Sequence, residues 1–316
     1  MHADADRPRV LTLIPLPERA SAALLDGYEA CALPGAGADD AIARFASAGI
    51  RAVVTNGSTG LSRAQMDRLP GLEIICAFGA GYENVDIAAA RQRGIVVTHA
   101  PGANDATVAD HALGLMLAVA RGFTALDAAV RRGDWHQARA ERPTLNGRRL
   151  GIVGLGRIGA RIAARAAAFE MQVAYSTRTP RMDVPWRHCA SVEQLARDSA
   201  FLVVACPGGT ATHHLINADV LRALGPDGFL INIARGSVVD SAALIAALQA
   251  GAIAGAGLDV FEGEPAIPAA LLACRNTVFT PHIAGRSPAS IAAQTDMLLA
   301  SLAAHFGGRS VPCQVP

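Results

Sequence analysis

Three polar residues, Arg235, Glu264 and His282, each follow a short apolar run that is typical of a buried strand. A guanidinium cation can hold a carboxylate and polarise a neighbouring carbonyl, and an imidazole can deliver a proton to a developing alkoxide. A carboxylate bonded to that imidazole fixes its tautomer and favours its protonated form. Taken singly, each residue also fits a structural role as a salt-bridge partner, a cap or a loop histidine. Together, at strand ends, they indicate reduction of a keto acid by hydride transfer.

Hydride transfer needs a dinucleotide, and a glycine-rich turn that suits one lies between an apolar run and an Ala-rich helical stretch. The glycines are Gly154, Gly156 and Gly159. The first permits a tight turn, the second lets the backbone approach a pyrophosphate, and the third lets the helix pack on the strand. The helix N-terminus presents free N–H groups to the phosphates. A turn that bound nothing would not need all three glycines at this spacing.

The end of the next expected strand, 172–176, bears on which dinucleotide is used. NAD-binding domains place Asp or Glu there, about 20 residues after the glycines, where it bonds the ribose 2′-hydroxyl. Here no acid precedes Asp183, and Ser176, Arg178 and Arg181 are present instead. Because arginine binds phosphate through its planar fork, we expect NADP(H) as the cofactor, with NAD(H) as the weaker alternative. The other interpretation is two arginines on a solvated surface loop.

The order of elements indicates an α/β protein with two doubly wound parallel-sheet domains, the second a Rossmann dinucleotide-binding domain. In the first, we expect strands at 10–14, 52–55, 74–77 and 95–98 and helices at 18–25, 39–48, 62–69 and 86–93. A long helix over 104–132 and an irregular arm over 133–143 follow. After the glycine turn we expect strands at 172–176, 201–205, 229–233, 254–259 and 278–280, with a helix at 241–250.

The last helix is expected to begin at Ser287-Pro288, an N-cap followed by proline, and to run to about residue 305. From chain order alone, this helix returns to the first domain and makes it discontinuous. We therefore expect a substrate-binding domain at 1–100 and 286–316 and a dinucleotide-binding domain at 101–285.

The composition excludes several classes of protein. The 316 residues carry a net charge of +1, which argues against binding nucleic acid or a membrane surface by bulk charge. No apolar run reaches the roughly 18 residues of a membrane span, and the acidic N-terminus lacks the features of a secretory signal, so we expect a cytoplasmic protein. The six cysteines are scattered, with no His/Cys cluster at metal spacing, and no metal site is expected.

The linked motifs resemble the D-isomer-specific 2-hydroxyacid dehydrogenases over nearly the whole chain. The motifs are Gly79-Ala80-Gly81, the segment 101–111, the glycine turn 154–159, Asn232-Ile233-Ala234-Arg235-Gly236, the segment 259–265 and the segment 281–285. The missing acid after the second strand is similar to that of the NADP-preferring glyoxylate and hydroxypyruvate reductases. One departure is Gly208-Gly209, where many relatives carry Leu-Thr, and this puts the contacts of that loop in doubt. The resemblance also implies a homodimer built through the long helix and the arm, with Trp135 buried between subunits.

The resemblance implies a role for each matching residue. The catalytic residues are Arg235, Glu264 and His282, and the substrate is bound by Gly79, Ala80, Gly81, Arg235 and His282. The cofactor-binding residues are Thr107, Gly154, Leu155, Gly156, Arg157, Ile158, Gly159, Ser176, Thr177, Arg178, Thr179, Arg181, Cys206, Pro207, Thr212, Ile233, Ala234, Asp259, His282 and Gly285. The implied activity is reduction of a small 2-keto acid such as glyoxylate or hydroxypyruvate to a D-2-hydroxy acid.

Two other functions compete with this one. A dinucleotide-sensing corepressor needs no proton donor and usually carries a partner-binding extension, whereas this chain has Arg235, Glu264 and His282 and no long polar tail. NAD-dependent formate oxidation needs no proton donor paired with a carboxylate, so Glu264 argues against it. The other histidines, including His213 and His214, lack such a setting, and we expect them to face solvent.

Overall fold

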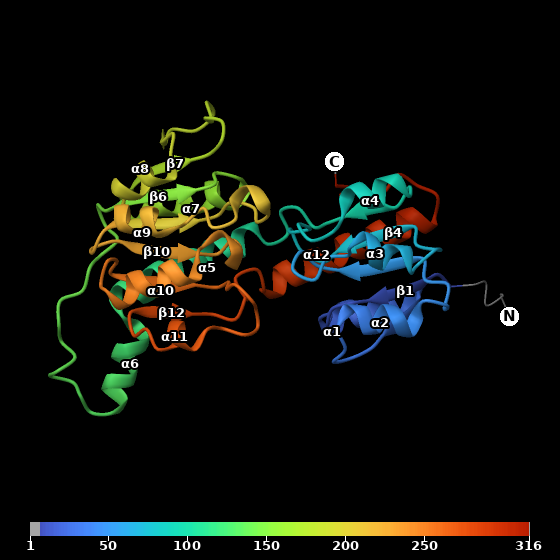
Figure 1. Ribbon diagram of the computed structural model, residues 1–316, viewed down its shortest axis with the longest axis horizontal. Coiled ribbons are helices and arrows are strands. Elements are labelled where there is room, and N and C mark those ends of the chain that lie inside the picture. Colours follow the sequence, from blue (N-terminus) through green and yellow to red (C-terminus); the bar gives the residue numbers. More distant parts are fainter. Residues whose placement is uncertain (1–6, 316) are drawn as a thin grey trace. The chain divides into compact units, whose positions relative to one another are not determined.

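The computed structural model describes residues 7–315 and divides into two compact units. Unit 1 comprises Met1–Asn104 and Arg286–Pro316, and unit 2 comprises Asp105–Gly285. Each unit contains one sheet in which every strand pairs in parallel with its neighbours (Figure 1). The predicted α/β fold class is confirmed.

The sheet of unit 1 has the order β2-β1-β3-β4-β5. Its strands are β1 (Arg9–Thr12), β2 (Glu29–Ala32), β3 (Ala52–Thr55), β4 (Ile74–Ala77) and β5 (Val96–Thr98). Its helices are α1 (Glu18–Gly27), α2 (Ala38–Phe45), α3 (Arg63–Asp67), α4 (Ile87–Gln92) and α12 (Pro288–Phe306).

Both faces of the unit 1 sheet are buried. Successive residues of a strand point to opposite faces of the sheet, so neighbouring residues pack in different clusters. On β3, Val53 packs in the cluster that contains Met66 of α3, and Val54 packs in the cluster that contains Leu302 of α12. The C-terminal helix therefore completes the core of the unit formed by the N-terminal residues. Its start is capped by Ser287, whose Oγ accepts a hydrogen bond from the Ser290 amide.

The sheet of unit 2 has seven strands in the order β12-β11-β10-β9-β6-β7-β8. They are β6 (Arg149–Val153), β7 (Gln172–Ser176), β8 (Arg187–His188), β9 (Phe201–Val204), β10 (Phe229–Asn232), β11 (Gly255–Leu258) and β12 (Thr277–Phe279). The helices are α5 (Asp105–Arg121), α6 (Phe123–Arg131), α7 (Arg157–Ala168), α8 (Val192–Arg197), α9 (Ala218–Leu224), α10 (Ser241–Gln249) and α11 (Ala269–Leu272), with 3-10 turns η1 (Thr210–Thr212) and η2 (Gly236–Val238).

Helices cover both faces of this sheet (Figure 1). On β9, Leu202 and Val204 pack in the cluster of α8, α9 and α10, whereas Phe201 and Val203 pack in the cluster of α5 and α7. The strand order changes direction between β6 and β9. Open α/β sheets bind ligands outside the carboxyl ends of the strands at such a point.

Two expectations from the sequence differ from the structure. The long helix over 104–132 is two helices, α5 and α6, because Gly122 between them adopts φ +68°. Strands β2 and β8 were missed, since each lies at a sheet edge, where one side is unpaired and the apolar pattern is weak. Within 7–315 no single helix has the length and hydropathy to cross a membrane, and only α5 and α6 together, bent by 56°, pass that test.

Candidate active site

The glycine turn after β6 has the geometry of a dinucleotide cradle. Gly154 adopts φ +93°, and a Cβ there would lie 2.7 Å from the Cα of Cys206, at the end of the neighbouring strand β9. A Cβ on Gly159 would collide with the carbonyl oxygen of Gly154, so α7 packs closely on the turn. A Cβ on Gly156 would meet nothing within 4 Å. The three glycines thus leave open space only at the N-terminus of α7, which has no side-chain cap, and the residues present fit a pyrophosphate.

The residues at the end of β7 and just after it are the candidate contacts of the adenosine ribose. Ser176 is buried, and the Oγ1 of Thr177 donates to the carbonyl of Thr179 at 2.7 Å. Arg178 is exposed, and within residues 7–315 it makes no hydrogen bond or ion pair. A phosphate could therefore bind its guanidinium without displacing another group.

Arg181 is held differently from Arg178. Its guanidinium forms a two-pronged pair with Asp183 and donates from Nη1 to the carbonyl of Leu155 at 2.9 Å. The hydrogen bond from Arg181 lowers the pKa of Asp183, which keeps this carboxylate charged. An acid is therefore present near the β7 end after all, although it is neutralised by an arginine.

The segment after β9 runs beside the glycine turn. Burial raises the pKa of the Cys206 thiol to about 11, so this side chain is a neutral, largely apolar group at neutral pH. The Oγ1 of Thr212 donates to the carbonyl of Pro207 at 2.7 Å and closes the loop between them. Both features suit a wall beside a bound ring.

Arg235 is presented by a turn that Asn232 closes. Asn232 is 1% exposed, and its side chain accepts from the amide of Ala234 at 3.1 Å and donates to the carbonyl of Arg235 at 3.0 Å. Arg235 in turn donates from Nη1 to the carbonyl of Ala234 at 2.6 Å. The sequence identified Arg235 but not the buried amide that orients it.

Two glycines near Arg235, Gly208 and Gly236, lie where a larger side chain would collide with its neighbours. A Cβ on Gly208 would lie 2.8 Å from the Cγ of Arg235, so the loop after β9 passes directly along the stem of this arginine. A Cβ on Gly236 would collide with the backbone of Phe261. The glycine that departs from the expected Leu-Thr motif therefore makes room for Arg235.

Glu264 and His282 are brought together from two different strand ends. His282 Nδ1 lies 2.8 Å from Glu264 Oε2, and Glu264 Oε1 accepts from the amide of Phe261 at 2.7 Å. Partial burial works to raise the pKa of Glu264, but the hydrogen bonds from His282 and Phe261 and the charge of Arg235 hold it below its ordinary value. Nε2 of His282 makes no hydrogen bond in the described part of the chain. The pair therefore leaves one imidazole nitrogen available for a substrate.

The loop that carries His282 is fixed by the buried carboxylate of Asp259. His282 adopts φ +51°, which non-glycine residues rarely adopt. Asp259 is 1% exposed and accepts from the amides of Ile283 and Ala284, both at 2.9 Å. Thr280 Oγ1 donates to the same carboxylate at 2.6 Å. These bonds hold the unusual backbone conformation of the histidine.

A second histidine supports this network. His111 Nε2 of α5 lies 2.9 Å from Thr280 Oγ1. Because the single hydroxyl hydrogen of Thr280 points to Asp259, the imidazole must be the donor. Sequence reasoning assigned no role to His111 or Thr280. Thr280 could have been found as a polar residue that follows an apolar strand. The residues around His111 on its helix, in contrast, do not indicate that it belongs to the site.

The remaining candidate cofactor residues lie around the same strand ends. Arg157 Nε donates to Asp105 Oδ2 at 2.7 Å, and Asp105 is 3% exposed, so this ion pair joins α7 to α5. Thr107 is on the first turn of α5. Leu155, Ile233 and Ala234 are buried, Ile158 and Gly285 are half-buried, and Thr179 is exposed.

The candidate substrate loop belongs to unit 1 and follows β4. Gly79 adopts φ +124°, and its carbonyl accepts from the amide of Ala100 at 2.7 Å. His99 Nδ1 donates to the carbonyl of Ala80 at 2.9 Å. Within 7–315 the amides of Ala80 and Gly81 donate no hydrogen bond. The carbonyls of this loop are thus anchored while its amides remain available for an anion, in a unit separate from that of Arg235, Glu264 and His282.

Comparisons with known proteins show the family of this chain. Residues 113–284 match the family model of the D-isomer specific 2-hydroxyacid dehydrogenase, NAD binding domain. A hydroxyphenylpyruvate reductase of Plectranthus scutellarioides is 42% identical over 261 residues, which are 82% of this chain and 83% of that protein. A glyoxylate/hydroxypyruvate reductase of Arabidopsis thaliana is 42% identical over 263 residues, which are 83% of this chain and 84% of that protein.

A solved structure is similar over almost the full length. The NADPH-dependent glyoxylate/hydroxypyruvate reductase of Sinorhizobium meliloti, in complex with NADP and malonate, has a TM-score of 0.90 and 40% identity, covering 98% of this chain and 97% of that chain. The resemblance inferred from the motifs is confirmed. The chain is therefore an oxidoreductase that belongs to the D-isomer specific 2-hydroxyacid dehydrogenase family.

Proposed function

We propose that this protein reduces small 2-keto acids to D-2-hydroxy acids, that glyoxylate and hydroxypyruvate are its preferred substrates, and that NADPH is its preferred reductant. The observation that carries the proposal is the hydrogen bond between His282 and Glu264, which leaves Nε2 of the imidazole available. This is the arrangement of a proton donor. Relatives named as reductases of glyoxylate and hydroxypyruvate support the choice of substrate.

In this proposal Arg235 binds the substrate carboxylate and the keto oxygen, and His282 donates a proton from Nε2 to that oxygen. A dinucleotide held at the glycine turn would supply the hydride that, with this proton, converts the C=O double bond to CH–OH. Glu264 accepts a hydrogen bond from Nδ1 and stabilises the charged imidazolium before the proton leaves. The amides of Ala80 and Gly81 are proposed to bind the substrate carboxylate as well.

The preference for NADPH rests on Arg178 and its neighbours. The guanidinium of Arg178 is exposed and has no hydrogen-bond or ion-pair partner within residues 7–315, and this residue follows Ser176 and Thr177 just after the end of β7. The pair of Arg181 with Asp183 opposes the preference, because the 2′-phosphate must compete with a carboxylate for that guanidinium. We propose that Arg178 makes the larger contribution.

A homodimer is proposed through the segment α6 and the arm that follows. Phe123, Val130 and Trp135 are 52%, 52% and 57% exposed in the single chain. Three large apolar side chains exposed on one short segment are typical of an interface. Burial of Trp135 by a second copy would remove this exposure.

Steady-state kinetics with glyoxylate, hydroxypyruvate, pyruvate and phenylpyruvate against NADPH and NADH test the proposal. The highest kcat/KM is expected for the two small substrates with NADPH. His282→Ala is expected to lower kcat about 10² to 10⁴-fold while leaving NADPH binding intact. Absence of turnover with every keto acid, or full turnover by His282→Ala, would overturn the proposal.

A further inference from the structure

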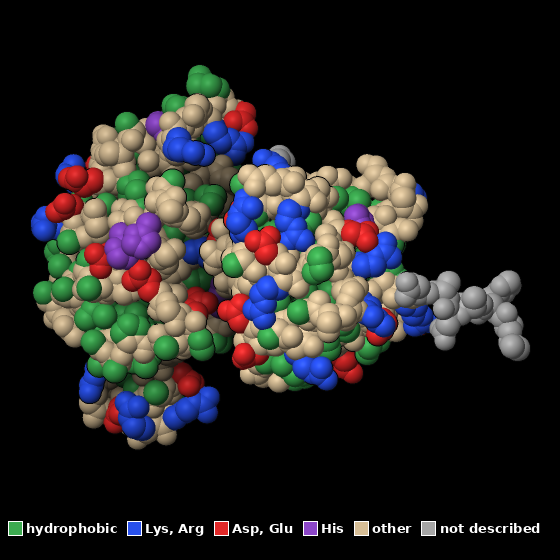
Figure 2. Space-filling model, turned by 45° about the vertical axis from the view of Figure 1, so that its right-hand side comes forward, with side chains coloured by type: hydrophobic (Ala, Val, Ile, Leu, Met, Phe, Trp, Pro, Cys, Tyr) green, Lys and Arg blue, Asp and Glu red, His purple; other side chains and the backbone are tan. Residues whose placement is uncertain are grey.

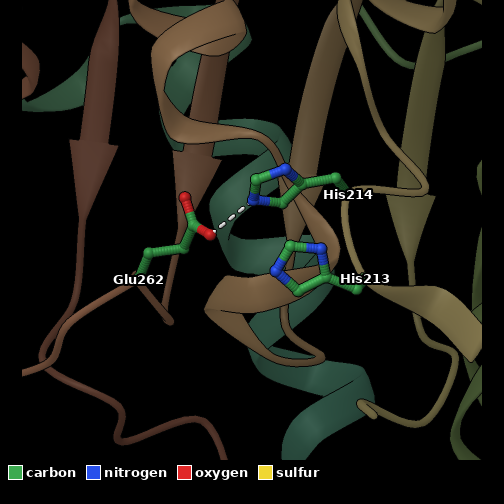
Figure 3. Close-up of side chains that lie close together, drawn as sticks. All are labelled: His213, His214 and Glu262. Carbon is green, nitrogen blue, oxygen red and sulfur yellow. Dashed lines mark hydrogen bonds and ion pairs between the residues drawn. The ribbon is translucent and has the colours of Figure 1, made fainter. Parts of the chain in front are cut away.

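Two histidines and a glutamate form a cluster on the surface of unit 2, outside the candidate active site. His213 and His214 follow η1, and Glu262 follows β11, so the tertiary fold brings them together across a sequence separation of 48 residues (Figure 3). Figure 2 shows histidine side chains gathered beside acidic ones on the surface of this unit. The expectation that both histidines simply face solvent is wrong for His214, which is half-buried and paired with Glu262.

The cluster has the donor set of a transition-metal site. His214 Nε2 lies 2.7 Å from Glu262 Oε1, and one ligand atom from each of the three residues lies within 4.8 Å of the others. Two ligands of a tetrahedral zinc ion are about 3.3 Å apart, given bond lengths of about 2.0 Å to nitrogen and oxygen. The cluster is therefore already close to the required size.

The carboxylate of Glu262 is oriented before any ion arrives. Its Oε2 accepts from the amide of Ser241, at the start of α10, at 3.0 Å, which turns Oε1 toward His214. Both carboxylate oxygens of Glu262 are thus held by hydrogen bonds, from Ser241 and from His214. Outer hydrogen bonds of this kind are typical of metal ligands.

The two imidazoles need only local changes before both can bind the same ion. His214 Nδ1 lies 3.9 Å from Asp240 Oδ2, so the ring proton can move from Nε2 to Nδ1, toward a second carboxylate. The rings of His213 and His214 are stacked, with centroids 3.9 Å apart and planes at 25°, so their lone pairs run side by side rather than converge. Because His213 is exposed, its ring can turn until one of its nitrogens points toward the ligand atoms of His214 and Glu262.

We propose that His213, His214 and Glu262 bind one Zn²⁺ ion, with water in the fourth position. Two imidazole nitrogens and one carboxylate oxygen suit zinc, whereas Mg²⁺ prefers oxygen ligands. The ion would join the segment after η1 to the segment after β11. Since only the folded chain assembles these ligands, binding stabilises the fold.

Isothermal titration of the full-length, chelator-treated protein with Zn²⁺ tests the proposal. One ion per chain is expected, with at least tenfold weaker binding in His213→Ala and in Glu262→Gln and unchanged binding in His136→Ala, a matched exposed histidine elsewhere in unit 2. Zn²⁺ should raise the Tm of the wild type and of His136→Ala but not of His213→Ala, and Mg²⁺ should raise none of them.

Co²⁺ serves as a spectroscopic probe, because the six cysteines are alternative ligands. Absorption bands of a nitrogen and oxygen site, lost in His213→Ala, are expected. A thiolate-to-cobalt charge-transfer band, binding that is equal in wild type and His213→Ala, or no heat of Zn²⁺ binding at micromolar protein would each overturn the proposal. His213 is exposed and makes no hydrogen bond in the described chain, so this variant retains the fold.

Discussion

Oε2 of Glu264 lies 2.8 Å from Nδ1 of His282, although the two residues follow different strands of the unit 2 sheet. The bond fixes which imidazole nitrogen faces the carboxylate and which remains for a substrate. The first prediction follows from this orientation of the ring.

Glu264→Gln is expected to lower kcat/KM for keto-acid reduction. The neutral amide can present its NH₂ rather than its oxygen to Nδ1, so the imidazole is no longer held in one tautomer with Nε2 toward the substrate. The measurement is kcat/KM with saturating NADPH. Glu141→Gln, an exposed glutamate in the arm, is the control. Equal kcat/KM in Glu264→Gln and wild type would show that the bond has no role in proton donation.

The same pair predicts how stability depends on pH. Because the folded pKa of Glu264 is depressed, its contribution is present above the ordinary carboxyl pKa and is lost as pH falls through the lower folded value. The difference in unfolding free energy between wild type and Glu264→Gln should therefore be constant near neutral pH and shrink below about pH 4. Urea denaturation across this range measures it. A difference that grows on acidification would contradict the assigned direction of the pKa shift.

Two substitutions of Arg235 test separately how its charge and its planar shape contribute to substrate turnover. Arg235→Lys keeps the cation but loses the planar fork, so it should restore only part of the kcat/KM lost in Arg235→Ala. NADPH affinity, measured by fluorescence titration, should change little in either variant. Arg275→Ala, an exposed arginine of unit 2, provides the control. Wild-type turnover by Arg235→Ala would remove this residue from the site.

The arginines after β7 predict a graded change in cofactor preference. Each charge-assisted hydrogen bond to the 2′-phosphate is worth about 1.5–3 kcal/mol, so Arg178→Ala should lower the NADPH/NADH ratio of kcat/KM at least about tenfold. Arg181→Ala should have a smaller effect, and Asp183→Asn should raise the ratio by releasing Arg181. Arg197→Ala is a control on the same unit. An unchanged ratio in the double variant Arg178→Ala, Arg181→Ala would contradict the NADPH assignment.

Asp259→Asn is expected to destabilise unit 2 and to misplace His282. The amide NH₂ would face one of the backbone N–H donors now bonded to the carboxylate, and a buried unsatisfied donor costs about 1–3 kcal/mol. The free energy of unfolding should fall by this amount, whereas Asp227→Asn at an exposed position should leave it unchanged. Equal stabilities would mean that Asp259 does not hold the His282 loop.

Trp135→Glu is expected to convert the proposed dimer into a monomer, because a charge would be buried where, in this proposal, the aromatic ring contacts the second copy. Sedimentation equilibrium at micromolar concentration measures the change. Met182→Glu is a strict control, since Met182 is 94% exposed and lies outside the arm. A monomeric wild type, or an unaltered dimer in Trp135→Glu, would place the interface elsewhere or exclude it.

The sequence alone determined the class of fold, the glycine turn and the candidate residues for catalysis. Strands β3, β4 and β7 lie at the predicted residues, since each contains an apolar run that is bounded by polar or turn residues. The glycine turn was recognisable because Gly154 and Gly159 meet steric demands that larger residues would not satisfy, while Gly156 leaves open space. These signals lie within short segments of the sequence, so they can be recognised without the tertiary structure.

Only the tertiary structure decided which side chains are paired. The ion pair of Arg181 with Asp183, the network of His111 and Thr280 around Asp259, and the contact of His214 with Glu262 are invisible in the sequence. Edge strand β2 was also missed, because hydrogen bonding to β1 rather than its own apolar pattern specifies it. A side chain's partner depends on which strand ends the sheet order brings together, and that order is set by the packing of the whole unit.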